Sequence, residues 1–218
     1  MSNAIVPLLV LALGAGDTLA AAAAVPDTAQ VGADARHLVQ WIAQSHDNAN
    51  GPFLIVDKRN ARVLVFDASA RLVDDAPVLL GAARGDDSVP GIGERKIADI
   101  KPFERTTPAG RFEAEAGRNL QGEDIVWVDY DAAVSMHRVR ATNPRERRLE
   151  RLATPTVADN RISYGCINVP AVFFNARISP LFRDGRHAVV YVLPETRALA
   201  QTFRGYASSM ASATPTRD

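Results

Sequence analysis

The sequence is short of cysteine, histidine and excess charge, and each shortage excludes a class of protein. Its single cysteine, Cys166, excludes an internal disulfide. The 25 basic and 25 acidic residues balance, so no field of one sign would attract nucleic acid or an anionic membrane. Among the four histidines, His37 and His46 are not spaced to share a helical face around a metal. We therefore expect no disulfide framework, no nucleic-acid partner, no metal and no cofactor.

A long hydrophobic run is also missing, although the N-terminus is apolar. Residues 5–13 form a short apolar run, Asp17 interrupts it, and residues 19–25 are small. Such a run is too short to span a bilayer, whereas an apolar segment before an alanine-rich zone is typical of a cleaved signal peptide. We expect a signal peptide over residues 1–24 and export to the periplasm or cell envelope. An uncleaved anchor and an unstructured leader stay open, because no Lys or Arg precedes Arg36.

What the sequence does contain is a series of short β-branched runs separated by turn residues. With 218 residues and 47% hydrophobic content, it is long enough for one domain of ordinary size. We expect a mainly β fold with α additions, in which residues 51–194 form the domain. An amphipathic helix over residues 35–45 belongs to an N-terminal segment, 25–50, and a helix and tail follow over 195–218. The expected strands are 53–57, 62–66, 71–73, 76–80, a strand from Phe112, 123–130, 132–137 and 187–193.

Two further stretches predict helices among the strands. Asn143 and Pro144 are typical of a helix start, and Leu149 and Leu152 are expected to face inward. This helix carries four arginines, which form either a solvated face or a rim that attracts substrate carboxylates. A second helix is expected to start at Pro170.

Residues 81–105 contain no periodic pattern and are expected to form an irregular surface flap. Gly91 and Gly93 lie in this flap, but no Gly-Lys-Ser or Gly-Lys-Thr follows them and no helix opens there. The pattern therefore argues against a nucleotide-binding loop.

The segment around Cys166 carries the most specific chemistry in the sequence. Gly165 lets the backbone turn sharply, and a helix starting at Pro170 would offer N–H groups that favour a thiolate. His137 ends a strand, on the same face as Ser135. A thiol needs a nearby base such as histidine to become a nucleophile at neutral pH. A buried structural thiol and a packed core histidine are the alternative interpretations.

Several of these features together resemble one known family. They are the hairpin over 53–66, the turn over 107–110, His137 at a strand end and the Ser-Tyr-Gly-Cys-Ile segment at 163–167. In combination they are similar to the L,D-transpeptidase catalytic domain, also called the YkuD domain, over residues 51–193. The resemblance implies a β-sandwich-like fold with a nucleophile loop leading into a helix, in an exported cell-wall enzyme.

The resemblance also implies roles for individual residues. Cys166 would attack a peptidoglycan stem peptide and hold its acyl group as a thioester, and His137 would act as the general base. Ser163 and Gly165 belong to the nucleophile loop, whose backbone N–H groups are candidates for the oxyanion hole. The implied partners are peptidoglycan stem peptides and, as one acyl acceptor, a wall-linked lipoprotein.

Three positions depart from the family pattern and bear on substrate binding. Asn168 stands where many members have an arginine, Arg138 follows the histidine in place of a glycine, and Tyr164 replaces a second histidine. We expect Tyr164, Asn168, Arg138 and Arg161 to contact the substrate. In this interpretation Arg138, Arg140 or Arg161 takes over the role of the missing arginine.

These departures leave other functions open on the same scaffold. One is a hydrolase, either an L,D-carboxypeptidase or an amidase that releases wall-linked protein. Another is a non-catalytic wall-binding module in which Cys166 is inert, and a third is a redox thiol. Acyl transfer requires a nucleophile and a base within hydrogen-bond reach, so the placement of Cys166 relative to His137 separates the catalytic from the inert interpretations.

Overall fold

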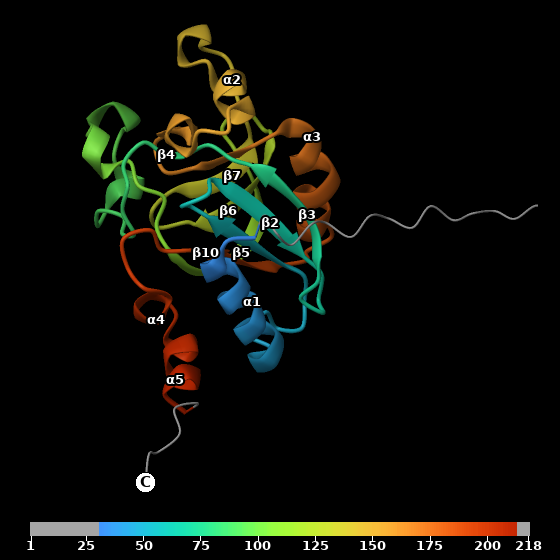
Figure 1. Ribbon diagram of the computed structural model, residues 1–218. Coiled ribbons are helices and arrows are strands. Elements are labelled where there is room, and N and C mark those ends of the chain that lie inside the picture. Colours follow the sequence, from blue (N-terminus) through green and yellow to red (C-terminus); the bar gives the residue numbers. More distant parts are fainter. Residues whose placement is uncertain (1–30, 213–218) are drawn as a thin grey trace, which may run out of the picture.

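The strands form one large mixed sheet and one small sheet (Figure 1). The computed structural model describes residues 31–212, so the expected signal peptide lies outside the described residues. The large sheet has eight strands in the order β3-β2-β1-β10-β5-β6-β7-β9, and β4 pairs with β8 in the small one. This arrangement confirms the expected mainly β fold with α additions. The bounds are β1 (Phe53–Asp57), β2 (Arg62–Phe66), β3 (Leu72–Pro77), β4 (Leu80–Gly81), β5 (Gly110–Arg118), β6 (Asp124–Asp129), β7 (Val134–Arg138), β8 (Arg161–Ser163), β9 (Ile167–Val169) and β10 (Ala188–Val192).

Helices and single helical turns surround this sheet. The α-helices are α1 (Ala33–Ser45), α2 (Arg148–Ala153), α3 (Ala171–Phe173), α4 (Leu199–Thr202) and α5 (Arg204–Ser212). The 3-10 turns are η2 (Ile92–Glu94), η3 (Ile97–Asp99), η4 (Pro102–Glu104), η5 (Pro144–Glu146), η6 (Val157–Asn160) and η8 (Ser179–Phe182), and η7 (Phe174–Ile178) is a π-turn. Over residues 31–212, the helices are too short or too polar for any of them to cross a bilayer.

The large sheet curls until its two ends meet. The chain leaving β3 bridges to β9 at the opposite end, where Leu79 and Asn168 exchange two backbone hydrogen bonds of 2.9 Å each. Inward-facing side chains from both halves of the sheet therefore share one core, which includes Leu54, Val126 and Met136. This closure brings the residues after β3 next to β9, and Cys166 lies directly before β9.

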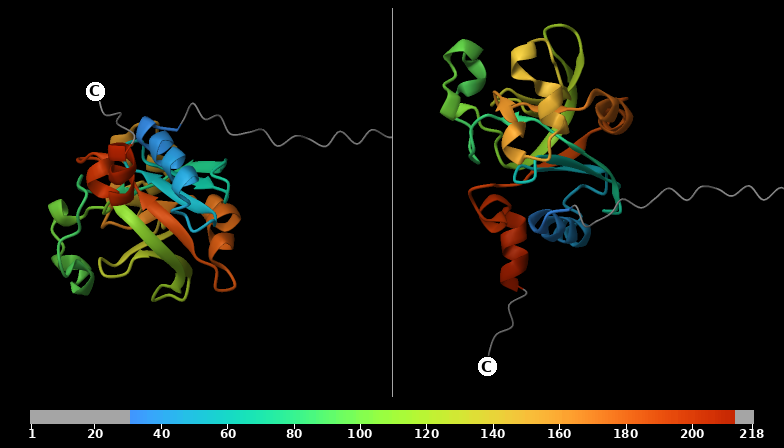
Figure 2. Two further views of the ribbon diagram at one scale, coloured as in Figure 1. Left: turned by 90° about the horizontal axis from the view of Figure 1, so that it is seen from below. Right: turned by 45° about the horizontal axis from the view of Figure 1, so that its top comes forward.

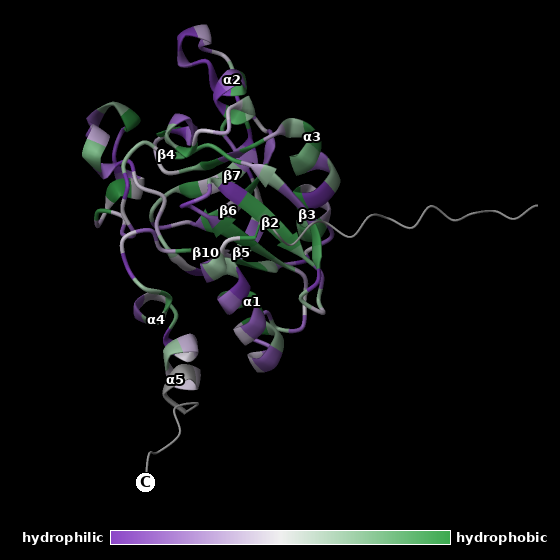
Figure 3. Cartoon of the chain, in the orientation of Figure 1, coloured by the Kyte–Doolittle hydropathy of each residue, from purple (hydrophilic) through white to green (hydrophobic). Residues whose placement is uncertain are grey.

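The opposite face of β1, β2 and β10 is covered by the terminal helices, which lie beneath the sheet in the right-hand view of Figure 2. Alternation along β1 sends Phe53 to this face, where its ring stacks on Phe66 with 4.9 Å between centroids. Leu38 and Ile42 of α1 pack into the same cluster. Because both faces of β1 are buried, the strand is apolar through most of its length, and Figure 3 shows this core sheet as hydrophobic.

The predicted helix start at Asn143 is correct, but the helix is interrupted. The side-chain oxygen of Asn143 accepts a hydrogen bond from the backbone N–H of Arg145 at 3.2 Å. Arg147 then has a φ of 51°, so the chain makes one 3-10 turn and restarts as α2. Leu152 is buried, whereas Leu149 is 59% exposed. The expectation that Leu149 faces inward is wrong, because the six-residue α2 presents a single apolar position to the protein.

The helix expected at Pro170 is present, with Pro170 as the N-cap of α3, but a strand separates it from Cys166. Residues 167–169 form β9, which pairs with β7 in parallel, and α3 begins only at Ala171. The apolar residues after the cysteine are therefore used in the sheet. The helix N–H groups expected to stabilise a thiolate lie beyond β9, and the groups that act on Cys166 come from β7 instead.

Candidate functional site

The parallel pairing of β7 and β9 brings the predicted nucleophile and base together. His137 lies opposite Asn168 in this register, and Cys166 ends the loop that leads into β9. Alternation along β7 places Val134 and Met136 in the core. Ser135 and His137 consequently share the other face, as predicted, and both reach Cys166.

The Cys166 thiol is partly exposed and surrounded by polar groups. Its Sγ lies 3.6 Å from the hydroxyl of Ser135 and 3.7 Å from the carbonyl oxygen of Ala133. Burial raises the pKa of the thiol, but the hydrogen bond and charge of His137 and hydrogen bonds from Ser135 bring it below its ordinary value. This environment favours the thiolate and is unlike that of an inert core cysteine.

The orientation of His137 determines which ring nitrogen can act as a base. Its Nδ1 lies 2.8 Å from the carbonyl oxygen of Arg138, which can only accept a hydrogen bond. Nδ1 therefore carries the proton, and Nε2 keeps its lone pair. Nε2 also lies 3.4 Å from the side-chain nitrogen of Asn168. The ring is thus arranged to accept a proton at Nε2.

Ser163 and Gly165 shape the loop that presents the cysteine. The hydroxyl of Ser163 donates to the carbonyl of Cys166 at 2.6 Å and accepts from the N–H of Gly165 at 3.1 Å. Gly165 has a φ of 131°, and a Cβ there would lie 2.8 Å from the carbonyl oxygen of Thr106. The position therefore requires glycine.

This hydrogen bonding also narrows the candidates for an oxyanion hole. The N–H of Gly165 is engaged by Ser163 and is not available to a substrate. The N–H groups of Tyr164 and Cys166 donate to no group in the described part of the chain. These two donors are therefore the remaining candidates for an oxyanion hole.

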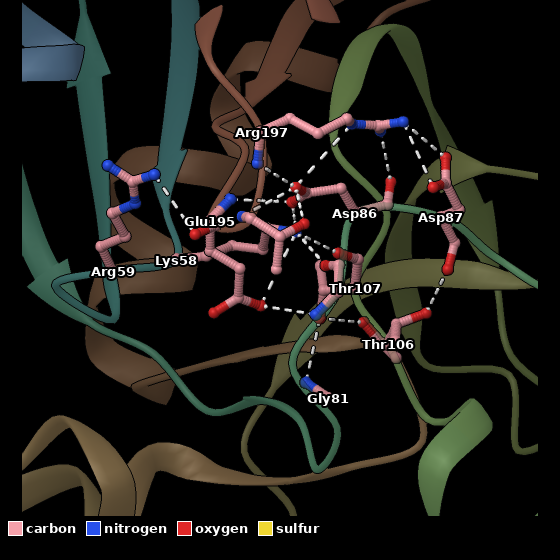
Figure 4. Close-up of polar contacts among 12 residues, drawn as sticks. Lys58, Arg59, Gly81, Asp86, Asp87, Thr106, Thr107, Glu195 and Arg197 are labelled. Atoms are coloured by element: carbon pink, nitrogen blue, oxygen red, sulfur yellow. Dashed lines mark hydrogen bonds and ion pairs between the residues drawn. The ribbon is translucent and has the colours of Figure 1, made fainter.

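A buried ionic network is centred on Lys58 (Figure 4). Lys58 is completely buried, and its Nζ donates to Asp86 at 2.8 Å, to the carbonyl of Gly85 at 2.5 Å and to that of Thr107 at 2.8 Å. The hydroxyl of Thr107 in turn donates to the carbonyl of Gly165 at 2.8 Å. The predicted turn at 107–110 thus links the network to the nucleophile loop.

Two of the arginines expected at the substrate site lie elsewhere. The guanidinium of Arg161 is buried against Glu195 at 2.7 Å and the carbonyl of Lys58 at 2.7 Å. Arg138 points to the opposite face of β7, where it pairs with Asp124 at 2.8 Å. Both guanidinium groups are thus committed to structural contacts away from the thiol. The third candidate, Arg140, is engaged on the surface by Gln121.

The arginine that does reach the site is Arg148, at the start of α2. Its Nη1 lies 2.5 Å from the side-chain oxygen of Asn168, which is almost completely buried. The sequence indicated a group of four arginines on this helix but gave no signal for which one turns inward. Which arginine faces the site depends on the break at Arg147, because α2 starts anew after it and its direction is set there.

Tyr164 forms part of the rim of the site. The residue is 38% exposed, and the guanidinium carbon of Arg105 lies 3.9 Å from the centroid of its ring. Arg105 ends the predicted flap, residues 81–105, which contains three 3-10 turns. Gly93 in this flap packs so closely against the carbonyl of Asp131 that a Cβ would lie 2.3 Å from it. The flap therefore packs against the turn between β6 and β7, which borders the site.

Nothing in residues 31–212 gathers three or more His, Cys, Asp or Glu side chains around a possible metal ion. The chemistry that the side chains around Cys166 can perform is nucleophilic attack by a thiol, with general-base help from an imidazole.

Comparisons with known proteins find likeness in structure only. No protein-family model and no curated protein matches the chain. The catalytic domain of an E. faecium L,D-transpeptidase aligns at 16% identity over 66% of this chain and 98% of that chain, with a TM-score of 0.36. The helical cell shape determining protein Pgp2 from Campylobacter jejuni aligns at 14% identity over 73% of this chain and 56% of that chain, with a TM-score of 0.43. Bd1075 from Bdellovibrio bacteriovorus aligns at 10% identity over 74% and 55%, with a TM-score of 0.41.

The alignments span little more than half the length of the last two proteins. At these identities and TM-scores they carry no conclusion about activity. A function has to be argued from the side chains around Cys166.

Proposed function

We propose that the protein is a cysteine acyltransferase of the cell envelope that acts on peptidoglycan stem peptides as an L,D-transpeptidase. The observation that carries the proposal is the β7–β9 pairing, which places His137 opposite Asn168 and so beside Cys166, with Nδ1 of the imidazole anchored on a backbone carbonyl. The resemblance of the motifs around both residues supports the substrate class. Residues 51–194 are the proposed catalytic domain, and residues 1–24 the proposed signal peptide.

In the first half-reaction, Nε2 of His137 takes the proton from the thiol while Sγ attacks the acyl carbon of the stem peptide. The N–H groups of Tyr164 and Cys166 stabilise the resulting oxyanion. The C–N bond of the peptide then breaks, His137 returns the proton to the leaving amine, and a thioester remains on Cys166. By the resemblance, the amine that leaves is D-alanine.

In the second half-reaction, an acceptor amine attacks the thioester carbon and His137 removes its proton. The C–S bond breaks, the new amide leaves, and Cys166 recovers its proton. Ser163 and Gly165 keep the loop in place throughout. Tyr164 is the proposed substrate-side residue, because it remains at the rim of the site. Asn168, also expected to contact substrate, is instead buried, with its amide engaged by Arg148 and by the carbonyl of Cys166.

The test is incubation of the mature protein with tetrapeptide-stem muropeptides, followed by mass spectrometry of protein and products. We expect release of D-alanine, an acyl adduct on Cys166 and cross-linked dimers. Cys166→Ala should abolish all three, and His137→Ala should slow adduct formation by about 100-fold or more. An unreactive Cys166 in the folded protein would reject the proposal in favour of a wall-binding module.

Water in place of the amine makes the same acyl-enzyme a hydrolase. Monomeric products without dimers, together with the adduct on Cys166, would therefore identify an L,D-carboxypeptidase or amidase. The proposed location is tested separately by the intact mass of the exported protein, which should lack residues 1–24.

A further inference from the structure

We propose that Arg148 is a positioning residue of the catalytic pair, acting through Asn168. By fixing the orientation of the Asn168 amide, it holds the imidazole of His137 in the neutral tautomer whose Nε2 accepts a proton. The proposal deepens the proposed function, on which it rests, because it concerns the same cysteine and histidine.

The amide of Asn168 is enclosed by three polar partners. Its oxygen faces Nη1 of Arg148 at 2.5 Å. Its nitrogen faces the carbonyl oxygen of Cys166 at 3.3 Å and Nε2 of His137 at 3.4 Å. Asn168 is only 1% exposed, so water is not at hand to replace a lost partner.

Arg148 determines which way this amide points. A guanidinium has five N–H donors and no acceptor, so the amide atom that faces it has to be oxygen. The amide nitrogen is then directed at Cys166 and His137. A flipped amide would set its N–H groups against the guanidinium and its oxygen against the carbonyl of Cys166. In a buried site, each unpaired group would cost about 1–3 kcal/mol.

The two contacts of the imidazole select the same tautomer. The carbonyl of Arg138 requires a proton on Nδ1, and the amide N–H of Asn168 requires a lone pair on Nε2. Once Nε2 has taken the proton of Cys166, it faces an N–H donor and no acceptor on the Asn168 side. This arrangement therefore favours return of the proton to the leaving amine.

The arginines near His137 are paired with carboxylates. Arg148 itself pairs with Glu146 of η5 at 2.5 Å, which offsets its charge. Arg138 is directed at Asp124 of β6. Burial raises the pKa of the neighbouring Cys166 thiol, and His137 lowers it. The orientation of the Asn168 amide is thus the feature that a change at Arg148 would alter.

The experiment compares Arg148→Met, which removes the donors, with Arg148→Lys, which keeps a donor and no acceptor. In the full chain, ¹⁵N NMR of the imidazole reports the tautomer, and iodoacetamide reports the thiolate fraction of Cys166 against pH. In Arg148→Met the amide is free to turn its oxygen toward Nε2–H and so stabilise the imidazolium–thiolate pair. At pH values below the midpoint of the alkylation profile, we expect the alkylation rate of Cys166 to rise about three- to tenfold. This corresponds to a midpoint that moves down by about half to one pH unit. Arg148→Lys should restore the wild-type profile and the Nδ1–H signal.

Arg151→Met is the matched control, because it loosens the same helix without touching Asn168. Arg151 holds α2 through the carbonyls of Glu146 and Asp159, at 2.8 and 2.9 Å. If Arg151→Met reproduces the shift, or if Arg148→Met leaves tautomer and profile unchanged, the positioning role is rejected. If His137→Ala leaves the wild-type profile unchanged, the catalytic pair itself fails, and that outcome is distinct from failure at Arg148 alone.

Discussion

One backbone carbonyl, that of Arg138, decides which nitrogen of His137 is available to the cysteine. The side chain of Arg138 was expected to bind substrate, yet it points to the other face of β7. What the residue contributes to the site is its main-chain oxygen, 2.8 Å from Nδ1. A sequence pattern identifies side chains but does not show where a backbone carbonyl points. The hydrogen bond from His137 to the carbonyl of Arg138 could therefore not be predicted.

The first prediction concerns the pKa of Cys166. Because His137 and Ser135 bring the pKa below its ordinary value, iodoacetamide should react with the folded protein at a lower pH than with the urea-denatured chain. Ser135→Ala removes one stabilising hydroxyl, so its alkylation midpoint should move to higher pH. His137→Ala should move it further. Equal midpoints for the folded and denatured wild-type chains would contradict the assignment.

The second prediction concerns Gly165. Gly165→Ala places a Cβ 2.8 Å from the carbonyl of Thr106 and forces an unfavourable φ, so the nucleophile loop has to shift. We expect a loss of about 1–3 kcal/mol in the free energy of unfolding and slower alkylation of Cys166. Gly122→Ala is the control, since Gly122 also has a positive φ but nothing lies within 4 Å of its Cβ position. An equal loss in both variants would show that the close approach to Thr106 is unimportant.

At the scale of elements, local pattern predicted the first hairpin and both helix starts near the site. The expected strands at 71–73 and 76–80 are wrong, because β3 runs without a break over Leu72–Pro77 and β4 is only Leu80–Gly81. The strands at 53–57 and 62–66 have the predicted bounds, because their apolar residues and the turn between them are local signals. Residues 167–169 were assigned no strand of their own. They become β9 only because β7, far away in the sequence, offers them a partner. Tertiary pairing of this kind leaves little local signal.

The third prediction tests the placement of α2. Leu152 is 8% exposed and Leu149 is 59% exposed, although the sequence treats them alike. Leu152→Ala should lower the free energy of unfolding by about 2–4 kcal/mol. Leu149→Ala should change it by about 0.5 kcal/mol or less. Urea unfolding of the two variants measures the difference. The reverse order would mean that α2 turns the other way, and with it Arg148.

At the scale of the whole molecule, the buried network joins segments that are far apart in the chain. Lys58 follows β1, Asp86 lies in the flap, Thr107 precedes β5 and Glu195 follows β10. Lys58 lies in the turn of the predicted 53–66 hairpin, where a lysine is ordinarily solvated. Lys58 is buried because the segments that carry the other three residues meet around it. No local sequence pattern predicts that meeting.

The fourth prediction follows from this convergence. Lys58→Met leaves the carboxylate of Asp86 and the carbonyl of Thr107 buried without their shared donor. Breaking a buried pair by removing one partner costs about 3–5 kcal/mol, so the unfolding midpoint in urea should fall sharply. Arg59→Met is the matched control one residue away, because Arg59 pairs with Asp34 at 3.0 Å on the surface with half of its side chain exposed. That pair should contribute about 1 kcal/mol or less.

The same pair of variants measures how far the network acts on the site. Thr107 connects Lys58 to the carbonyl of Gly165, so Lys58→Met should also slow alkylation of Cys166 under conditions in which the variant remains folded. Arg59→Met should leave that rate unchanged. If Lys58→Met loses stability but alkylates at the wild-type rate, the network supports the fold alone, and the nucleophile loop keeps its shape through Ser163.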